Sequence, residues 1–216
     1  MDLLSNLHKG NLFIHVSAGI LALLIGIFIL LTVKRGRLHR VSGRIFLVFM
    51  WLVVFTGLLG VFVFNRNGFL LVITILSGYM AFSGFRAVRR RCNEPAILDI
   101  VVALLSLSSV FFFIWYFSKI GMIWSPIIIY STVGYLVMAV GYDLGRYFVP
   151  KAKYGNLWLY EHILKMVSAF SGLLSAFTGT VLPEYQPYSQ FLPSVLGGLI
   201  AVGFIIYVSV KSVQYL

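Results

Sequence analysis

The sequence predicts an all-α membrane protein, a bundle of seven transmembrane helices, on three observations. Of its 216 residues, 60% are hydrophobic and only 11% are charged, and the mean hydropathy of +0.97 is far above that of soluble domains. Seven apolar stretches are each about 20 residues long, which is the length that crosses a bilayer as a helix. Basic residues gather in every second connection between these stretches, as they do in cytoplasmic loops.

The predicted spans follow one another along the whole chain. We place them at residues 12–33, 45–64, 68–88, 97–118, 124–147, 159–182 and 193–213. A transmembrane β-barrel is excluded, because its strands alternate apolar and polar residues over about ten positions, whereas Leu21–Val33 is apolar apart from Gly26 and Thr32. No connection is long enough to fold separately, so we expect residues 1–216 to form a single transmembrane domain. The first eleven residues lack a basic leader, and we expect the first span to be retained.

The distribution of basic residues predicts the orientation of the chain. Basic residues lie at the end of every second span or just after it. After the first span they are Lys34, Arg35, Arg37, Arg40 and Arg44, and at the third they are Arg86, Arg89, Arg90 and Arg91. At the fifth they are Arg146, Lys151 and Lys153, and at the seventh Lys211. The opposite side carries only Lys9, Arg66 and Lys119. The N-terminus is therefore predicted to lie outside and the C-terminus in the cytoplasm. Because the net charge of +11 is spread over separate loops, we expect contact with anionic lipid and no binding of nucleic acid.

The sixth span has the clearest polar face. At about 100° per residue, six of its positions fall in one narrow sector. They are Glu161, Lys165, Ser168, Gly172, Ser175 and Gly179. A stripe of small residues with an i,i+4 carboxylate and amine at one end indicates a face packed against other helices. The charged pair either neutralises itself or belongs to a proton or ion relay.

Further polar residues lie at the same predicted depth, at the cytoplasmic ends of several spans. We predict a polar cytoplasmic-side cluster that comprises His39, Arg40, Arg44, Asp99, Asp143, Arg146, Glu161, His162 and Lys165. Its members can form salt bridges that lock helices together, or they can form a catalytic or binding cluster. We favour the salt-bridge interpretation.

His15 is the most notable polar residue of the first span. It shares a sector of about 60° with Gly19, Ala22 and Gly26, so it faces the bundle from just below the outer surface. The imidazole either hydrogen-bonds a neighbouring helix or ligates haem or a metal ion, since glycine beside an axial histidine lets the macrocycle lie flat.

His39 and His162 are the other candidate ligands for haem. Both belong to the opposite leaflet from His15, across most of a hydrocarbon core about 30 Å thick. A simple bis-histidine site that includes His15 is therefore disfavoured. We predict no cofactor or metal, and b-type haem stays an alternative.

No common catalytic motif occurs in the sequence to support an enzymatic function. The sequence has no nucleophile elbow, Walker loop, His-Glu-x-x-His pair or Cys-x-x-Cys. Cys92 is the only cysteine, which excludes an intramolecular disulfide and a thiolate metal cluster within the chain. Gly141 and Gly145 form a Gly-x-x-x-Gly pair, which indicates close helix packing inside a protomer or between protomers.

Short motifs along nearly the whole chain suggest a family. They are His15-x-x-x-Gly19, Arg37-Leu38-His39-Arg40-x-x-Gly43-Arg44, Tyr79-x-x-x-Ser83-Gly84-x-Arg86, Asp99, Asp143-Leu144 and Glu161-His162-x-x-Lys165-Met166, followed by a small-residue helix that ends at Pro183. In this order they resemble a large group of uncharacterised bacterial membrane proteins classed only as a domain of unknown function. The resemblance implies a seven-helix, multi-pass protein of the bacterial inner (plasma) membrane, and it supplies no activity. In that group a basic residue usually stands at the place of Glu161 or Lys165, so the acidic Glu161 argues against anion binding there.

Three classes of function fit the sequence. The favoured one is a membrane-embedded accessory or binding protein, with a membrane-protein partner or a second copy of itself. The second is a small-molecule or proton-coupled transporter, for which the buried charges would have to face a water-filled cavity. The third is a b-type haem electron-transfer protein or quinone-linked oxidoreductase that uses His15, His39 or His162.

Overall fold

The described part of the chain, residues 2–32, 36–64, 69–120 and 126–213 of a computed structural model, is all-α. Its α-helices are α1 (Asp2–Leu31), α2 (Arg37–Phe62), α3 (Phe69–Arg90), α4 (Ile97–Ile120), α5 (Pro126–Gly145), α6 (Lys151–Tyr154), α7 (Leu157–Val181) and α8 (Tyr188–Val213), with 3₁₀ helices η1 (Arg146–Phe148) and η2 (Pro183–Tyr185). Seven of the helices, all but the four-residue α6, are long and apolar enough to cross a membrane. The prediction of an all-α chain is confirmed, and so is the number of helices that are long and apolar enough to be membrane spans in the described residues.

Several helices extend beyond the predicted spans. α1 begins at Asp2 rather than at residue 12, α2 at Arg37 rather than 45, and α8 at Tyr188 rather than 193. Hydropathy marks only the part of a helix that lies in hydrocarbon, whereas backbone hydrogen bonding continues past it. Arg37 and Arg40, assigned to a loop from sequence, therefore lie in the first turn of α2. Lys34, Arg35 and Arg66 lie outside the described residues.

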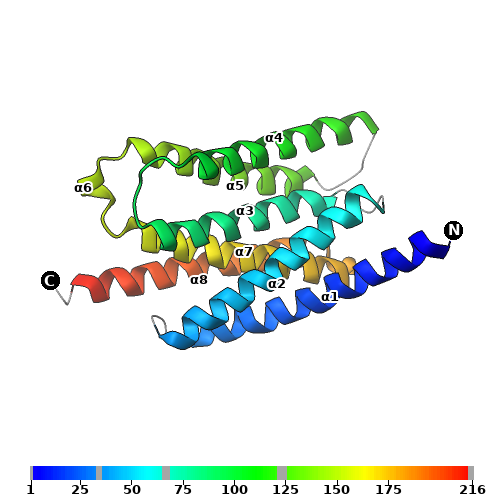
Figure 1. Ribbon diagram of the computed structural model, residues 1–216, viewed down its shortest axis with the longest axis horizontal. Coiled ribbons are helices and arrows are strands. Elements are labelled where there is room, and N and C mark those ends of the chain that lie inside the picture. Colours follow the sequence, from blue (N-terminus) through cyan, green and yellow to red (C-terminus); the bar gives the residue numbers. More distant parts are fainter. Residues whose placement is uncertain (1, 33–35, 65–68, 121–125, 214–216) are drawn as a thin grey trace. The chain divides into compact units, whose positions relative to one another are not determined.

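The chain divides into two compact units, Met1–Thr74 and Ile75–Leu216. In the first unit, α1 and α2 lie side by side (Figure 1). Small residues of α1 make this packing close: Ala22 is fully buried, and a Cβ on Gly19 would lie 3.9 Å from Val53 of α2. The predicted His15–Gly26 face therefore does pack against a helix.

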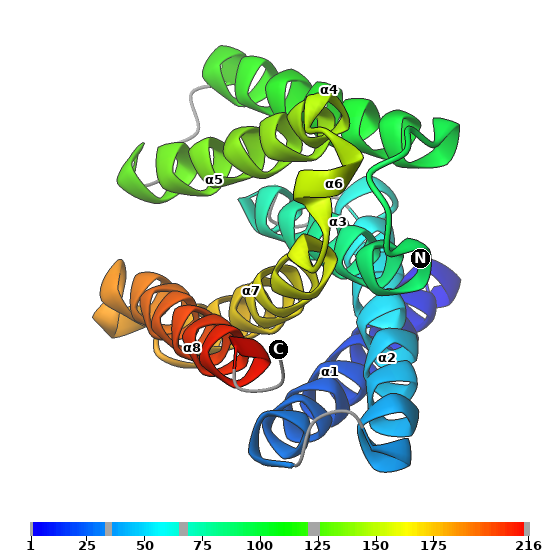
Figure 2. The ribbon, with the colours of Figure 1, turned by 90° about the vertical axis from the view of Figure 1, so that its left-hand side faces the viewer.

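The second unit contains the rest of α3 and all later helices. α4 lies beside α5, and α7 beside α8 (Figures 1 and 2). A Cβ on Gly84 of α3 would lie 3.0 Å from Cβ of Lys165, and one on Gly172 would overlap the side chain of Ser77. These close approaches bring the predicted polar face of α7 against α3. All six residues of that face are buried except the half-buried Ser168.

Pro193 lies inside α8. Proline has no N–H, so the backbone carbonyl of Ser189, four residues earlier, loses its helical donor. The hydroxyl of Thr178 on α7 donates to that carbonyl. A neighbouring helix thus satisfies the carbonyl that proline frees, which is how membrane helices tolerate proline.

The prediction of a single domain and the predicted orientation in the membrane stay predictions. The seven candidate spans support a multi-pass membrane protein.

Candidate functional site

Two buried carboxylates and two buried cations lie near one end of α5 and α7. Asp143 lies in the last turn of α5, Arg146 begins η1, and Glu161 and Lys165 lie in the first turns of α7. Their exposed fractions are only 6%, 5%, 4% and 3%, respectively. Isolated charges at such depth would be very costly, so their partners decide what the site can do.

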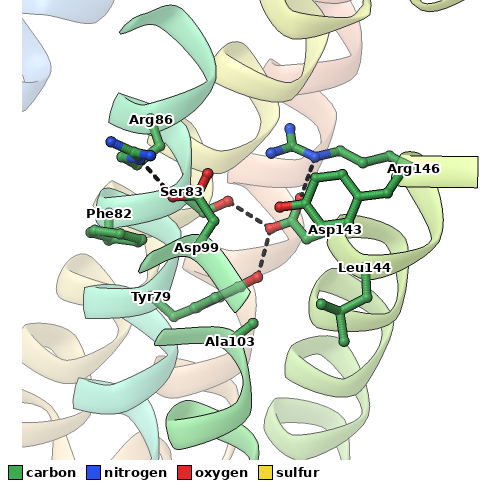
Figure 3. A pocket seen from close by; sticks show the side chains of 10 residues that line it. Tyr79, Phe82, Ser83, Arg86, Asp99, Ala103, Asp143, Leu144 and Arg146 are labelled. Atoms are coloured by element: carbon green, nitrogen blue, oxygen red, sulfur yellow. Dashed lines mark hydrogen bonds and ion pairs between the residues drawn. The ribbon is translucent and has the colours of Figure 1, made fainter. Parts of the chain in front are cut away.

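Asp143 is held by three donors from two other helices. Its Oδ2 accepts hydrogen bonds from the hydroxyls of Tyr79 and Ser83 on α3, both at 2.6 Å (Figure 3). Its Oδ1 accepts a hydrogen bond from Nζ of Lys165 on α7. The carboxylate therefore joins α3, α5 and α7.

Glu161 forms the second half of the cluster. It accepts hydrogen bonds from Nη1 of Arg146 and, at 2.9 Å, from the hydroxyl of Tyr142. Arg146 also donates to the hydroxyl of Tyr154, at 3.3 Å. Burial, together with the charge of Glu161, raises the pKa of Tyr154 above its ordinary value, so this phenol stays neutral and can accept.

Each helix also carries a looser pair of its own. Nε of Arg146 lies 4.0 Å from Oδ1 of Asp143, three residues earlier. Nζ of Lys165 lies 3.8 Å from Oε2 of Glu161, four residues earlier. The shorter contacts run between the helices, from Arg146 to Glu161 and from Lys165 to Asp143. We call these four residues the charge cluster; two positive and two negative charges balance within it.

Asp99, in the first turn of α4, has different partners. Its carboxylate accepts from Nε of Arg86 at 2.6 Å and from Nη1 of Arg90 at 3.2 Å, both on α3. Both arginines are among the basic residues that predict the cytoplasmic side. They fasten α3 to α4 as well.

A small cleft lies between Asp99 and the charge cluster. Its lining combines apolar side chains with the polar side chains of Tyr79, Ser83, Arg86, Asp99, Asp143, Arg146 and Tyr147 (Figure 3). Its volume of about 10 Å³ is room for about one water molecule. Nε of Arg146 is buried and has no hydrogen-bond partner among the described residues.

His162 does not join the charge cluster. Its Nδ1 lies 2.9 Å from the backbone carbonyl of Gly84. Because a carbonyl can only accept, Nδ1 carries the hydrogen, and in the neutral imidazole Nε2 then keeps its lone pair. His162 therefore ties α7 to α3 by a hydrogen bond.

His15, in the first unit, has a similar arrangement. Its Nδ1 lies 2.8 Å from the hydroxyl oxygen of Thr56, and that hydroxyl lies 2.6 Å from the carbonyl of Leu52, to which it donates. The Thr56 oxygen therefore accepts from Nδ1 of His15, and in the neutral imidazole Nε2 again keeps its lone pair. Nδ2 of Asn11 also donates to the Thr56 carbonyl, at 3.1 Å. The neighbouring-helix hydrogen bond is one of the two interpretations given for His15.

Connections at this end of the second unit are tied together. The buried amide of Asn93 donates to the carbonyls of Arg146, at 3.2 Å, and Val149. The exposed Lys151 and Glu94 pair at 2.6 Å; the hydrogen bond and charge of Lys151 hold the pKa of Glu94 below its ordinary value. These links hold the α3–α4 connection to the end of α5.

The structure brings together four residues of the predicted cluster and separates others. Asp143, Arg146, Glu161 and Lys165 interact directly, whereas Asp99 and His162 have partners of their own. His39, Arg40 and Arg44 belong to the first unit, so their pairing with these charges stays a prediction. No group of three metal-binding side chains occurs within the described ranges.

The predicted cluster left out several members of the site. They are Tyr79, Ser83, Tyr142 and Tyr154, which hydrogen-bond the charges, and Arg86 and Arg90, which hold Asp99. Of these, Tyr79, Ser83 and Arg86 were noted from sequence only as parts of a family motif. The i,i+4 spacing of Tyr79 and Ser83 puts both hydroxyls on one face of α3 and could have signalled them. Nothing in the local sequence distinguishes Tyr142 or Tyr154.

Comparisons with known proteins find no match to a protein-family model, a curated protein or a solved structure. The family resemblance therefore rests on the motifs alone and stays a prediction.

Proposed function

We propose that this chain is a membrane-embedded accessory or binding protein, in which the charge cluster fastens helices of the second unit into a fixed scaffold. One observation carries the proposal: each of the four buried charges has an opposite charge as its hydrogen-bonded partner. A cluster that is neutral in itself leaves no charge to hold an ionic substrate. Paired burial of this kind fixes helix positions.

The transporter alternative receives less support from the same geometry. A carrier needs its ionisable groups to face a cavity that admits a substrate. Here the charges are at most 6% exposed, and the adjoining cleft has room for about one water.

The partner is proposed to be another membrane protein or a second copy of this chain. Gly141 and Gly145 on α5 are exposed, and a Cβ on either would have nothing within 4 Å in the described residues. Small residues on an open helix face allow a second helix to approach closely.

Isolation in mild detergent after cross-linking in intact membranes tests this proposal. We expect a reproducible partner or a dimer, and reduced capture for Gly141→Leu. Gly203→Leu on α8, which is equally open, is the matched control. Recovery of an unaccompanied monomer in every preparation would contradict the proposal.

Haem binding is kept as a second candidate because of the histidine tautomers. Both His15 and His162 hold Nδ1 in a hydrogen bond. In the neutral imidazole this leaves the lone pair of Nε2 for a ligand, which is the arrangement that second-shell partners give to metal-ligating histidines. If His15 is a ligand, the reduced-minus-oxidised spectrum of purified protein shows a Soret change that His15→Ala removes. A colourless preparation without iron eliminates the candidate.

We further propose that the chain lies in a bacterial inner membrane with its N-terminus outside, in contact with anionic lipids at the basic loops. The motif resemblance supports the membrane, and the alternation of basic connections supports the orientation.

A further inference from the structure

Arg91 has an unusual backbone conformation at the end of α3. It directly follows the last residue of that helix, and its φ of 52° lies in the left-handed region. Its N–H donates to the carbonyl of Ala87 at 3.0 Å and closes the last turn. Glycine is the usual residue at such a position, because it has no Cβ. An arginine there strains the backbone, which points to a role for its side chain.

Two contacts position the guanidinium of Arg91. Its Cζ lies 4.6 Å from the ring centroid of Trp158, in the first turn of α7, and the cation is attracted to the face of the indole. Its Nε donates to the carbonyl of Val88 at 3.3 Å. Stacking uses one face of the guanidinium and leaves its edge, with Nη1 and Nη2, for hydrogen bonds in the plane.

The carboxylates at this end of the second unit are paired with other cations. Glu94 binds Lys151, Asp99 binds Arg86 and Arg90, Asp143 binds Lys165, and Glu161 binds Arg146. Among the residues that the structure describes, none of these carboxylates is paired with Arg91. Arg91 is exposed, and Arg89 in the last turn of α3 is a second exposed cation. This surface therefore favours an anion.

The place of Arg91 and Trp158 along the chain points to a lipid as the source of that anion. The candidate span of α3 ends at Arg90, and that of α7 begins at Leu157. Tryptophan is enriched at this level of a bilayer, where the lipid headgroups lie. Arginine matches phosphate oxygens with two parallel N–H···O bonds. A headgroup with no ammonium of its own also avoids repulsion by Arg89 and Arg91.

We propose that Arg91 binds the phosphodiester headgroup of one anionic phospholipid, with Trp158 as the positioning residue that holds the guanidinium. Nη1 and Nη2 donate to two phosphate oxygens, and the bound lipid lies where the end of α3 meets the start of α7. The inference rests on the proposed contact between the basic loops and anionic lipid. It assigns that contact to one positioned arginine rather than to charge alone.

Native mass spectrometry of the full-length protein in mild detergent, titrated with phosphatidylglycerol or phosphatidylcholine, tests the site. We expect wild type to bind one phosphatidylglycerol more tightly than phosphatidylcholine. Arg91→Lys keeps the charge but loses the planar fork, so it should weaken phosphatidylglycerol binding about tenfold. Arg89→Lys is the matched control and should leave binding unchanged. Equal effects of the two lysine variants would overturn the site, as would displacement of the lipid by an equal concentration of inorganic phosphate. If wild type does not prefer phosphatidylglycerol, the proposed contact with anionic lipid fails, and this inference fails with it.

The positioning role of Trp158 is tested in the same titration. Trp158→Leu should weaken phosphatidylglycerol binding about threefold through the lost stack, and Trp158→Phe should restore most of it. In an Arg91→Gln background, Trp158→Leu should have no further effect, because the guanidinium that it positions is gone. Additive losses in that background would show that Trp158 does not act through Arg91.

Two variants separate lipid binding from stability. Arg91→Gly should unfold at a higher temperature than Arg91→Gln, because only glycine takes the left-handed conformation without strain. Both should nevertheless bind phosphatidylglycerol equally weakly. If binding instead rises with the unfolding temperature across these variants, Arg91 acts through stability and the proposal is overturned.

Discussion

At the scale of single residues, Asp143 of α5 links α3 and α7 by accepting several hydrogen bonds at its carboxylate. Its two oxygens receive donors from Tyr79, Ser83 and Lys165. A buried pair of this kind contributes little compared with apolar residues of the same shape, but loss of one partner leaves an uncompensated buried charge. The effect of substitution therefore depends on whether one or both partners are changed.

Asp143→Asn should lower the free energy of unfolding by about 3–5 kcal/mol, because it leaves the ammonium of Lys165 buried without its carboxylate. Asp143→Asn/Lys165→Gln should recover a large part of that loss. Unfolding in detergent, followed by circular dichroism, measures both. Glu94→Gln, which removes an exposed pair, is the control and should leave stability unchanged. A double variant as unstable as the single one would show that the ion pair is not the cause.

At the scale of helices, α7 packs closely on two sides. Gly172 meets Ser77 of α3, and Gly197 of α8 meets Ser171 of α7. A hydroxyl and a glycine oppose each other at both contacts. In lipid, where helices gain little from hydrophobic burial, such close van der Waals contact is a main source of association.

Two adjacent glycines of α8 provide a matched test of that packing. A Cβ on Gly197 would lie 2.7 Å from Cβ of Ser171, whereas one on Gly198 would have nothing within 4 Å. Gly197→Ala should therefore destabilise the protein by about 1–3 kcal/mol. Gly198→Ala should be neutral or stabilise it by up to about 1 kcal/mol, because alanine favours helix. Thermal unfolding in detergent compares them, and equal effects would contradict the close contact between Gly197 and Ser171.

The hydrogen bond from Thr178 to the Ser189 carbonyl, which Pro193 leaves without its helical donor, predicts that substitutions at positions 178 and 193 have coupled effects on stability. Thr178→Val should cost about 1 kcal/mol in the native background, since the Ser189 carbonyl loses its donor. In a Pro193→Ala background the backbone N–H of residue 193 returns to that carbonyl, so the same change should cost less. A double-mutant cycle of unfolding free energies measures the difference. Equal costs in the two backgrounds would exclude the interaction.

At the scale of the whole molecule, the number of spans and their direction can be tested together. Cys92 lies between α3 and α4, and Glu184 lies in η2 between α7 and α8. Three candidate spans separate them, so the prediction that each of these spans crosses the membrane places them on opposite sides.

A membrane-impermeant maleimide should therefore label Cys92 only after the cells are opened. Glu184→Cys, made in a Cys92→Ser background, should be labelled from outside intact cells. The reverse pattern would overturn the proposed orientation. Labelling of both positions from one side would overturn the number of spans.

The fold class was predictable because hydrocarbon demands long apolar runs. The helix bounds were not, because helices continue through polar residues such as Asp2 and Arg37, outside the predicted spans. The charge cluster was predictable in its membership because ionisable residues are rare in spans. The pairing of charges within the cluster was not predictable, because the cation that binds Asp143 depends on how the helices are rotated and which helices are neighbours. Neutral donors such as Tyr79 do not stand out as ionisable residues in a span do.

The two kinds of pair within the charge cluster bear on how the protein enters the membrane. The fifth span carries Asp143 and Arg146 three residues apart, and α7 carries Glu161 and Lys165 four residues apart. We therefore expect each segment to enter the membrane with its own charges neutralised, before any neighbour is present. Once the segments meet, we expect the same side chains to form the shorter contacts between helices. Reversing the charges of only one helix would keep insertion intact but place like charges opposite each other during assembly.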